Sequence, residues 1–195
     1  MEVKKFGRIG VLMGGPSTER DISLKSGRTV YEALLQLGLE AIAIDIKTDN
    51  IEENINLIKS YKINCAFLAL HGRFGEDGQI QKILEIIKIP YTGSGVKASR
   101  LSMDKIASRL IFDSGGLKVP RYSVVDKALY NKNYKFYNNL GLPLVIKPAT
   151  HGSSIGLSII DKEEDLKNAL DSAFTFDEKI IIEEYIEGRE VTGGI

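Results

Sequence analysis

The sequence predicts an α/β protein in which a domain built on a parallel sheet precedes a second domain of α+β type. Apolar, β-branched runs alternate with segments of helical periodicity up to about residue 93, and this alternation is typical of a parallel sheet covered on both faces. Glycine-rich polar loops follow two of the buried runs directly. Near residue 94 the pattern changes to short strands with hairpin-like connections.

Three strands and three helices are expected in the first domain. Apolar residues form continuous or alternating runs in the strands and recur at helical spacing in the helices. The expected strands are 8–13, 41–46 and 65–70, and the expected helices are 23–37, 51–61 and 79–87.

The second domain is expected to open with a helix over 98–112, ended by Gly115 and Gly116. A helix at about 134–140 separates the strands 121–125 and 144–147, and a turn at 150–156 leads into a strand over 157–160. Asp161 and Glu164 have the spacing of a capping box, which predicts that a helix follows. A further strand begins at Ile180, and Gly188 separates it from another short run.

Composition excludes several classes of function. The chain has 26 basic and 26 acidic residues, so bulk charge predicts neither a nucleic-acid surface nor an anionic-membrane surface. No apolar stretch is long enough for a signal peptide or a membrane span. The single cysteine, Cys65, lies in an apolar run and is interpreted as a small buried hydrophobe. A reduced, cytoplasmic protein is expected.

The first glycine-rich loop, 14–21, reads Gly-Gly-Pro-Ser-Thr-Glu-Arg-Asp and follows a buried strand. Ligands of parallel sheets bind at this edge, and glycines permit close approach of the backbone. The loop is no dinucleotide fingerprint, and a carboxylate such as Glu19 suits an ammonium group of a ligand. Capping of the next helix by Ser17 or Thr18 explains the same loop equally well.

The second loop, 71–78, reads His-Gly-Arg-Phe-Gly-Glu-Asp-Gly. His71 stands at the end of a strand, where it can orient or polarise a substrate carboxylate. The structural alternative is a tight turn with Glu76 and Asp77 at the start of the next helix. We favour a binding function, because so dense a group of glycines and charges has little structural use.

Lys147 ends an apolar strand and precedes a Gly/Ser loop. Backbone amides and the hydroxyls of Ser153 and Ser154 can close on phosphate oxygens while the lysine neutralises their charge. The order of a P-loop is missing and no helix follows, so we expect a hairpin. A plain hairpin turn is the alternative, and the buried lysine argues against it because such lysines almost always have a partner.

The connector 183–190 is rich in carboxylates and follows another apolar strand. Its acidic side chains, beginning with Glu183, suit the amino group of an adenine and the hydroxyls of a ribose. An ordinary solvated hairpin explains this composition equally well.

The order of these motifs resembles the D-alanine–D-alanine ligase family of the ATP-grasp superfamily, from Ile9 to Ile195. The matching motifs are Gly-Gly-x-Ser-x-Glu-Arg at 14–20, His-Gly-x-x-Gly-Glu-Asp-Gly at 71–78, Ser-Met-Asp-Lys at 102–105, Lys-Pro at 147–148, Gly-Ser-Ser-x-Gly at 152–156, Glu183, and Gly-Arg-Glu at 188–190. The resemblance implies a Rossmann-like, substrate-binding amino-terminal domain over 1–93, a central ATP-grasp subdomain over 94–178, and the beginning of a carboxy-terminal ATP-grasp subdomain over 179–195.

The resemblance also implies a role for each matching residue. Glu19 would bind the ammonium group of a first D-alanine, His71 would lie beside its carboxylate, and Ser153 would link to the Glu19 network. The residues that it implies for ATP are Lys105, Lys147, Ser153, Ser154, Glu183, Glu184, Ile186 and Glu190.

The implied reaction belongs to the synthesis of peptidoglycan precursors. The γ-phosphoryl group of ATP passes to the carboxylate of the first D-alanine, and the amine of a second D-alanine then attacks the acyl phosphate. A homodimer and Mg²⁺ or Mn²⁺ are implied as well. In the family the metal ligands, a phosphoryl-stabilising arginine and a covering loop follow the position of Ile195. We therefore expect the 195-residue chain to be inactive alone, and the choice of D-alanine or D-lactate as second substrate is left open.

Two other classes are weighed against this resemblance. A non-enzymatic nucleotide-binding module would bind ATP without releasing ADP. A Rossmann-type oxidoreductase is disfavoured by the missing dinucleotide fingerprint and by the loop after Lys147. Other carboxylate–amine ligases of the superfamily remain open, although the loops with Glu19 and His71 fit D-alanine best.

Overall fold

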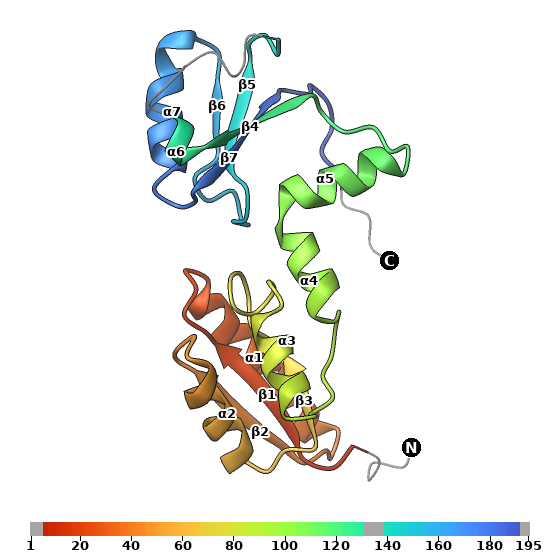
Figure 1. The fold of residues 1–195 in the computed structure, drawn as a ribbon. Helices are drawn as coiled ribbons and strands as arrows, with labels where there is room; N and C mark the ends of the chain where they lie inside the picture. The colour runs from red at the N-terminus through yellow and green to blue at the C-terminus, as the bar shows by residue number, and fades with distance from the viewer. Residues whose placement is uncertain (1–5, 131–138, 192–195) are drawn as a thin grey trace. The chain divides into compact units, whose positions relative to one another are not determined.

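The computed structural model describes residues 6–130 and 139–191 and divides into two compact units, Met1–Met103 and Asp104–Ile195 (Figure 1). None of the helices among the described residues has the length and apolar character needed to cross a lipid bilayer.

A parallel sheet of three strands, in the order β2-β1-β3, forms the centre of the first unit. Its strands are β1 (Ile9–Gly14), β2 (Ala41–Ile46) and β3 (Cys65–Leu68). The helices are α1 (Arg20–Gln36), α2 (Ile51–Ser60), α3 (Gln79–Ile86) and α4 (Val96–Met103). The prediction of a parallel α/β sheet is confirmed.

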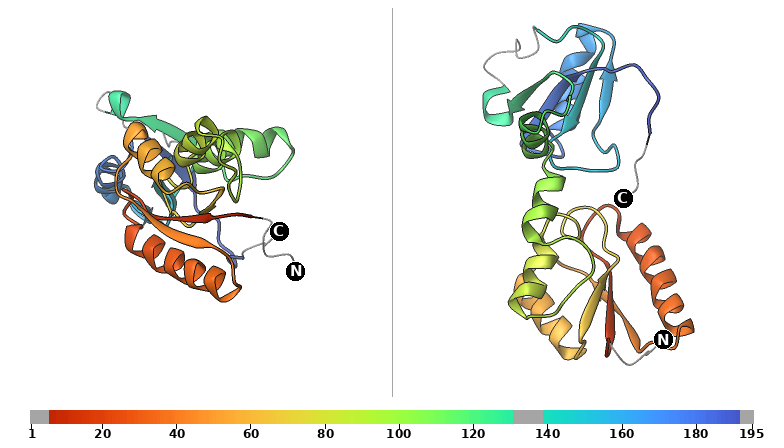
Figure 2. Two further views of the ribbon diagram at one scale, coloured as in Figure 1. Left: turned by 90° about the horizontal axis from the view of Figure 1, so that it is seen from below. Right: turned by 90° about the vertical axis from the view of Figure 1, so that its right-hand side faces the viewer.

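Apolar clusters cover both faces of this sheet, with α1 on one face and α2 and α3 on the other (Figure 2). Val11 and Met13 of β1 pack under α1, whereas Leu12 packs with Ile44 and Ile46 on the opposite face. Every residue of β1 is therefore buried, which explains its continuous apolar sequence. The strand order reverses between β1 and β3, and ligands of such sheets bind at the carboxyl ends of the strands beside this point.

The second unit is built on an antiparallel sheet of four strands in the order β4-β7-β5-β6. The strands are β4 (Tyr122–Asp126), β5 (Leu144–Pro148), β6 (Ser158–Ile160) and β7 (Lys179–Glu184). The helices are α5 (Lys105–Ser114), α6 (Lys127–Tyr130) and α7 (Leu166–Ala173). The combination of helices with antiparallel strands confirms the predicted α+β class of this part.

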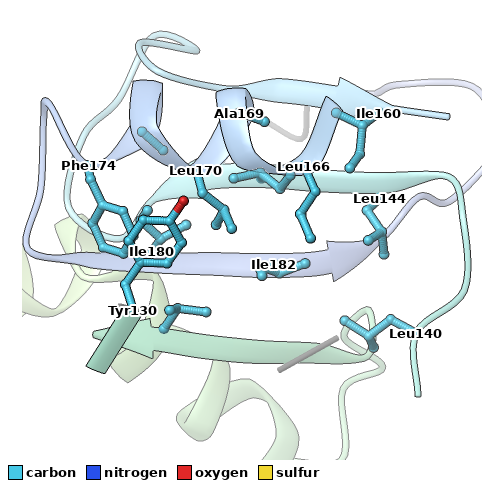
Figure 3. Close-up of a cluster of buried hydrophobic side chains, with 13 residues drawn as sticks. Tyr130, Leu140, Leu144, Ile160, Leu166, Ala169, Leu170, Phe174, Ile180 and Ile182 are labelled. Carbon is cyan, nitrogen blue, oxygen red and sulfur yellow. The ribbon is translucent and has the colours of Figure 1, made fainter. Parts of the chain in front are cut away.

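Helix α7 packs on one face of this sheet (Figure 3). Leu144 and Ile146 of β5 meet Ile180 and Ile182 of β7 there, together with Leu170 of the helix. Because side chains alternate along a strand, the residues between them point to the opposite face. That opposite face carries the charged groups described below.

The single helix expected over 98–112 is wrong, since α4 ends at Met103 and α5 begins at Lys105. Asp104 between them has an extended backbone, with φ −90° and ψ 101°, and its carboxylate accepts hydrogen bonds from the amides of Ile106 and Ala107 at 2.9 and 3.0 Å. Apolar residues keep helical spacing across this break, so periodicity alone does not reveal it. The side-chain cap of Asp104 starts a new helix.

The expected capping box of Asp161 and Glu164 is also wrong. A short 3-10 helix, Glu163–Asp165, precedes α7, and neither element has a side-chain hydrogen bond at its cap. The helix expected at about 134–140 lies largely outside the described residues, and 185–191 are not in a strand. The predicted domain limits at 93 and 178 stay predictions. Helix α4, which follows the first of these limits, belongs to the first compact unit. Strand β7, which follows the second, pairs with β4 and β5.

Candidate functional site

In the first unit, the loops that follow β1 and β3 contact each other. The hydroxyl of Ser17 donates a hydrogen bond of 2.8 Å to the carbonyl of His71 and accepts one of 3.2 Å from the amide of Glu19. The Glu19 carboxylate lies against Gly72, where an added Cβ would come within 2.5 Å of its Oε2. Capping by Ser17 or Thr18 is not found, because α1 begins at Arg20 without a side-chain cap.

His71 has a polar neighbour at each ring nitrogen. Its Nε2 lies 2.9 Å from the hydroxyl of Ser26 on α1, and its Nδ1 lies 3.6 Å from Oε1 of Glu76. Both His71 and Glu76 remain partly exposed, with 34% and 48% of their side chains accessible. This pair is thus available to a small polar ligand.

Asp77, in contrast, serves the loop itself. Its carboxylate accepts hydrogen bonds of 3.0 Å from the amide of Phe74 and of 3.1 Å from the amide of Gln79, at the start of α3. The structural interpretation of the second loop therefore holds for Asp77. The first part of the same motif faces the other loop instead.

A cavity of about 510 Å³ adjoins His71 and Glu76. Its wall includes Gln81, which is 96% buried, and several hydroxyl groups. The residues that line it are Leu68, Leu70, His71, Gly75, Glu76, Gln81, Thr92, Gly93, Ser94, Ser99 and Ser102. The carboxyl end of β3 thus opens onto a cavity lined by both apolar and polar side chains, at the edge of the sheet where the sequence predicts a ligand.

In the second unit, Lys147 and Glu183 lie on the face of the sheet opposite α7. Nζ of Lys147 forms an ion pair with Oε1 of Glu183, and only 18% and 7% of the two side chains are exposed. The expectation that this lysine has a partner is therefore confirmed. Glu183 was expected to meet an adenine, and its role there stays a prediction because cations engage its carboxylate in this structure.

Lys105 stands at the first turn of α5 and is fixed to the end of β5. Its Nζ donates to the carbonyls of Pro148, at 3.0 Å, and His151, and its backbone amide donates to the carbonyl of Ala149 at 3.0 Å. Burial and the neighbouring charge of Lys147 hold the pKa of Lys105 below its ordinary value. Two lysines whose charges act on each other form a site suited to a polyanion.

Sequence reasoning missed Arg109, one helical turn after Lys105. Its Nη2 pairs with Oε2 of Glu183, and its guanidinium lies 5.0 Å from the centre of the Tyr122 ring. The spacing of four residues within a helix was the available signal, because it places both cations on one face of α5.

The loop after β5 is anchored at its start by Asp177. The amide and the hydroxyl of Thr150 both donate to Oδ2 of Asp177 at 2.8 Å. Burial alone would raise the pKa of Asp177, but the hydrogen bonds from Thr150 and the amide of Lys179 together lower it. Ser153 and Ser154 further along have φ angles of 52° and 57°, a strained conformation of the kind that concentrates at functional sites.

The remaining predicted residues lie at and beyond the end of β7. Glu184 pairs with the exposed Arg121 at 2.6 Å, and hydrogen bonds from that residue lower its pKa. Ile186 is 61% exposed. Glu190 is exposed and lies outside regular structure. Their expected contacts with adenine and ribose stay predictions, as does a link between Ser153 and Glu19, which belong to different units.

Among residues 6–130 and 139–191 there is no group of three or more His, Cys, Asp or Glu side chains that could hold a metal ion.

Comparison with known proteins gives a consistent result along the chain. Two family models match, the D-ala D-ala ligase N-terminus over residues 47–94 and the D-ala D-ala ligase C-terminus over 111–195. A D-alanine–D-alanine ligase of Trichlorobacter lovleyi is 49% identical over 189 residues, which is 96% of this chain and 58% of the relative.

Solved structures agree with the sequence relatives. The D-alanine–D-alanine ligase of Bacillus anthracis superposes with a TM-score of 0.83 at 36% identity, covering 93% of this chain and 58% of that one. The same ligase complexed with ATP gives a TM-score of 0.82 at 35% identity, covering 93% and 60%. The chain thus spans about three fifths of the length of these relatives. It belongs to the D-alanine–D-alanine ligase family.

Proposed function

We propose that this chain is the D-alanine- and ATP-binding part of a ligase that joins two D-alanines into D-alanyl-D-alanine. The observation that carries this proposal is the pair Lys105 and Lys147, held beside each other at the end of β5 by backbone carbonyls and by Glu183. Like charges held close together in a half-buried site favour a polyanionic ligand such as the triphosphate of ATP.

Phosphoryl transfer depends mainly on position and on positive charge around the transferred group. In the proposed reaction Lys105 and Lys147 bind phosphate oxygens, and the loop with Ser153 and Ser154 closes over them. The γ-phosphoryl group passes from ATP to the carboxylate of D-alanine, giving an acyl phosphate and ADP. The amine of a second D-alanine attacks the acyl carbon, loses a proton, and phosphate leaves.

The contacts between the two loops of the first unit support binding of the first D-alanine there. The Glu19 carboxylate can accept hydrogen bonds from the ammonium group of this substrate. His71, between Ser26 and Glu76, can donate to its carboxylate when the imidazole is protonated. Mg²⁺, when bound, would neutralise charge on the phosphates.

The nucleotide site is tested by calorimetric titration of the purified chain with the non-hydrolysable analogue AMP-PNP. The wild-type chain should bind it, and Lys147→Met should weaken binding by about tenfold or more, the usual cost of losing one charge-assisted contact. Lys127→Met is the matched control, because Lys127 pairs with Glu178 in the same unit but outside the proposed site. Equal affinity of Lys147→Met and wild type would refute the site.

The ligase activity is tested in a chimera that joins residues 1–195 to the remaining part of the Trichlorobacter lovleyi relative, which this chain does not cover. ADP release should require D-alanine, and Glu19→Gln should raise the KM for D-alanine. The 195-residue chain alone should bind nucleotide without turnover. ADP release that is independent of D-alanine would contradict the substrate, and nucleotide binding without any release in a folded chimera would favour a binding module.

The proposal includes a homodimer formed through the first unit. Ile22 and Leu35 of α1 and the adjoining Leu37 are 59%, 46% and 64% exposed, so each could be covered by a partner subunit. Light scattering coupled to size exclusion should give twice the chain mass of 21.6 kDa. A mass of one chain at micromolar concentration would contradict the dimer.

A further inference from the structure

Arg109 is an arginine in the second unit with only 11% of its side chain exposed. It lies four residues after Lys105 on α5, so both side chains project from the same face of the helix. Burial of a guanidinium destabilises the folded state unless neighbouring groups compensate its charge. The contacts of Arg109 show which groups do so.

Its side chain contacts a carboxylate, an aromatic ring and one backbone carbonyl, that of Pro120, to which Nη1 donates at 3.5 Å. Nη2 of Arg109 pairs with Oε2 of Glu183, while Nζ of Lys147 pairs with Oε1 of the same carboxylate. The guanidinium also lies over the ring of Tyr122, 5.0 Å from its centre. Tyr122 is the cross-strand neighbour of Glu183 in the β4–β7 pair, so sheet register places the ring and the carboxylate side by side.

Arg109 gives the group of charged side chains around Lys105 a net positive charge. The groups that act electrostatically on Lys105 are the cations Lys147 and Arg109 and the carboxylates Asp177 and Glu183. Three cations against two carboxylates leave the cluster with a charge of +1. Without Arg109 the cluster would be neutral, and among residues 6–130 and 139–191 Lys147 alone would remain as an ion-pair partner of the buried Glu183.

We propose that Arg109 is a positioning residue of the nucleotide site, which takes one oxygen of Glu183 and thereby leaves Lys147 able to bind phosphate. This inference rests on the proposed function, because it concerns the same lysines. Arginine suits the task better than lysine does. Its guanidinium stays charged, directs its donors in a fixed plane and stacks on an aromatic ring.

The experiment compares AMP-PNP with adenosine, which lacks phosphates, as ligands of the purified chain. Arg109→Met should weaken binding of AMP-PNP by about tenfold, as expected for a lost charge contact, and should change adenosine affinity less than twofold. Arg109→Lys should recover part of the loss, because it keeps the charge without the stacking. Lys127→Met, an ion-paired cation outside the cluster, is the control and should match wild type for both ligands.

The double variant Arg109→Met, Glu183→Gln separates positioning from a structural role. Removing the carboxylate frees Lys147 again, so the ratio of AMP-PNP to adenosine affinity should return towards that of wild type. A purely structural arginine would lower the melting temperature and weaken both ligands together, without recovery in the double variant.

The outcomes distinguish this inference from the proposed function. If wild type binds AMP-PNP and Arg109→Met leaves the affinity ratio unchanged, the inference is wrong and the nucleotide site stands. If wild type binds neither ligand, both fall. If Arg109→Met unfolds the chain, Arg109→Lys supplies the comparison: a ratio of AMP-PNP to adenosine affinity below that of wild type supports the inference, and a ratio equal to that of wild type overturns it.

Discussion

Ser23→Ala would remove one oxygen atom that joins the ends of two strands in the first unit. Ser23 is fully buried; its hydroxyl accepts a hydrogen bond of 2.8 Å from the amide of Gly14 and donates one of 2.7 Å to the carbonyl of Ala69. The alanine variant leaves both backbone groups buried and unpaired. At roughly 1–2 kcal/mol for each group, the free energy of unfolding of this unit should fall by about 2–4 kcal/mol.

Loss of these two hydrogen bonds should also disturb the loops that carry Glu19 and His71, because Gly14 begins the first loop and Ala69 lies two residues before His71. Hydrogen exchange in increasing urea, followed in peptides from β1 and β3, reports the stability of this unit separately from the other.

Ser60→Ala is the matched control for this change. Ser60 also hydrogen-bonds to a backbone carbonyl, that of Leu57 at 2.7 Å, but it is exposed on α2. It should lose less than about 0.5 kcal/mol. Equal stability of Ser23→Ala and Ser60→Ala would refute the reasoning that the buried hydroxyl carries this connection.

Three further changes test the site from other directions. In Lys147→Met the pKa of Lys105 should rise towards its ordinary value, since a like charge is removed while burial remains; NMR titration of ¹³C-methylated lysines measures it. Gly72→Ala should weaken D-alanine binding, because a Cβ at φ +68° would come within 2.5 Å of Glu19 Oε2; calorimetry measures the affinity. Asp177→Ala should lower stability at pH 7 by about 2–3 kcal/mol, the cost of losing hydrogen bonds to a charged group.

The pH dependence of the last change has a definite sign. The folded-state pKa of Asp177 lies below its ordinary value of 3.8, so its contribution is complete above that value and is lost as pH falls through the folded-state pKa. Urea unfolding of wild type and Asp177→Ala should therefore converge in acid; a constant difference would contradict this. An unchanged pKa of Lys105, or unchanged D-alanine affinity in Gly72→Ala, would contradict the other two predictions.

Structural features that depend on local sequence were predicted correctly. The continuous apolar run of β1 predicts a strand buried on both faces, because only such a strand has no polar side. The lysine at the end of β5 predicts a partner for its charge, because burial without one is costly. The two glycine-rich loops stay predicted binding segments, since glycine and charge directly after a strand are poor choices for a simple connector.

Local patterns were insufficient where two signals compete. The break between α4 and α5 depends on the cap formed by Asp104, although apolar residues continue with helical spacing. The expected capping box at Asp161 failed in the opposite sense, because the spacing is present but the chain forms a 3-10 helix instead. A short motif offers the possibility of a hydrogen bond, and the surrounding chain decides whether it forms.

By itself the sequence determined the α/β class of the first unit, the positions of the two glycine-rich loops after β1 and β3, and the family. These features depend on periodicity, residue type and motif order, which can be recognised in the sequence without knowledge of tertiary contacts. Only the tertiary structure showed that one carboxylate, Glu183, is shared by Lys147 and Arg109, and that the buried hydroxyl of Ser23 joins two strand ends. The residues in these contacts are far apart in the sequence: 36 residues separate Lys147 from Glu183, 74 separate Arg109 from Glu183, and 46 separate Ser23 from Ala69. Strand register and helix packing decide which of such distant residues meet.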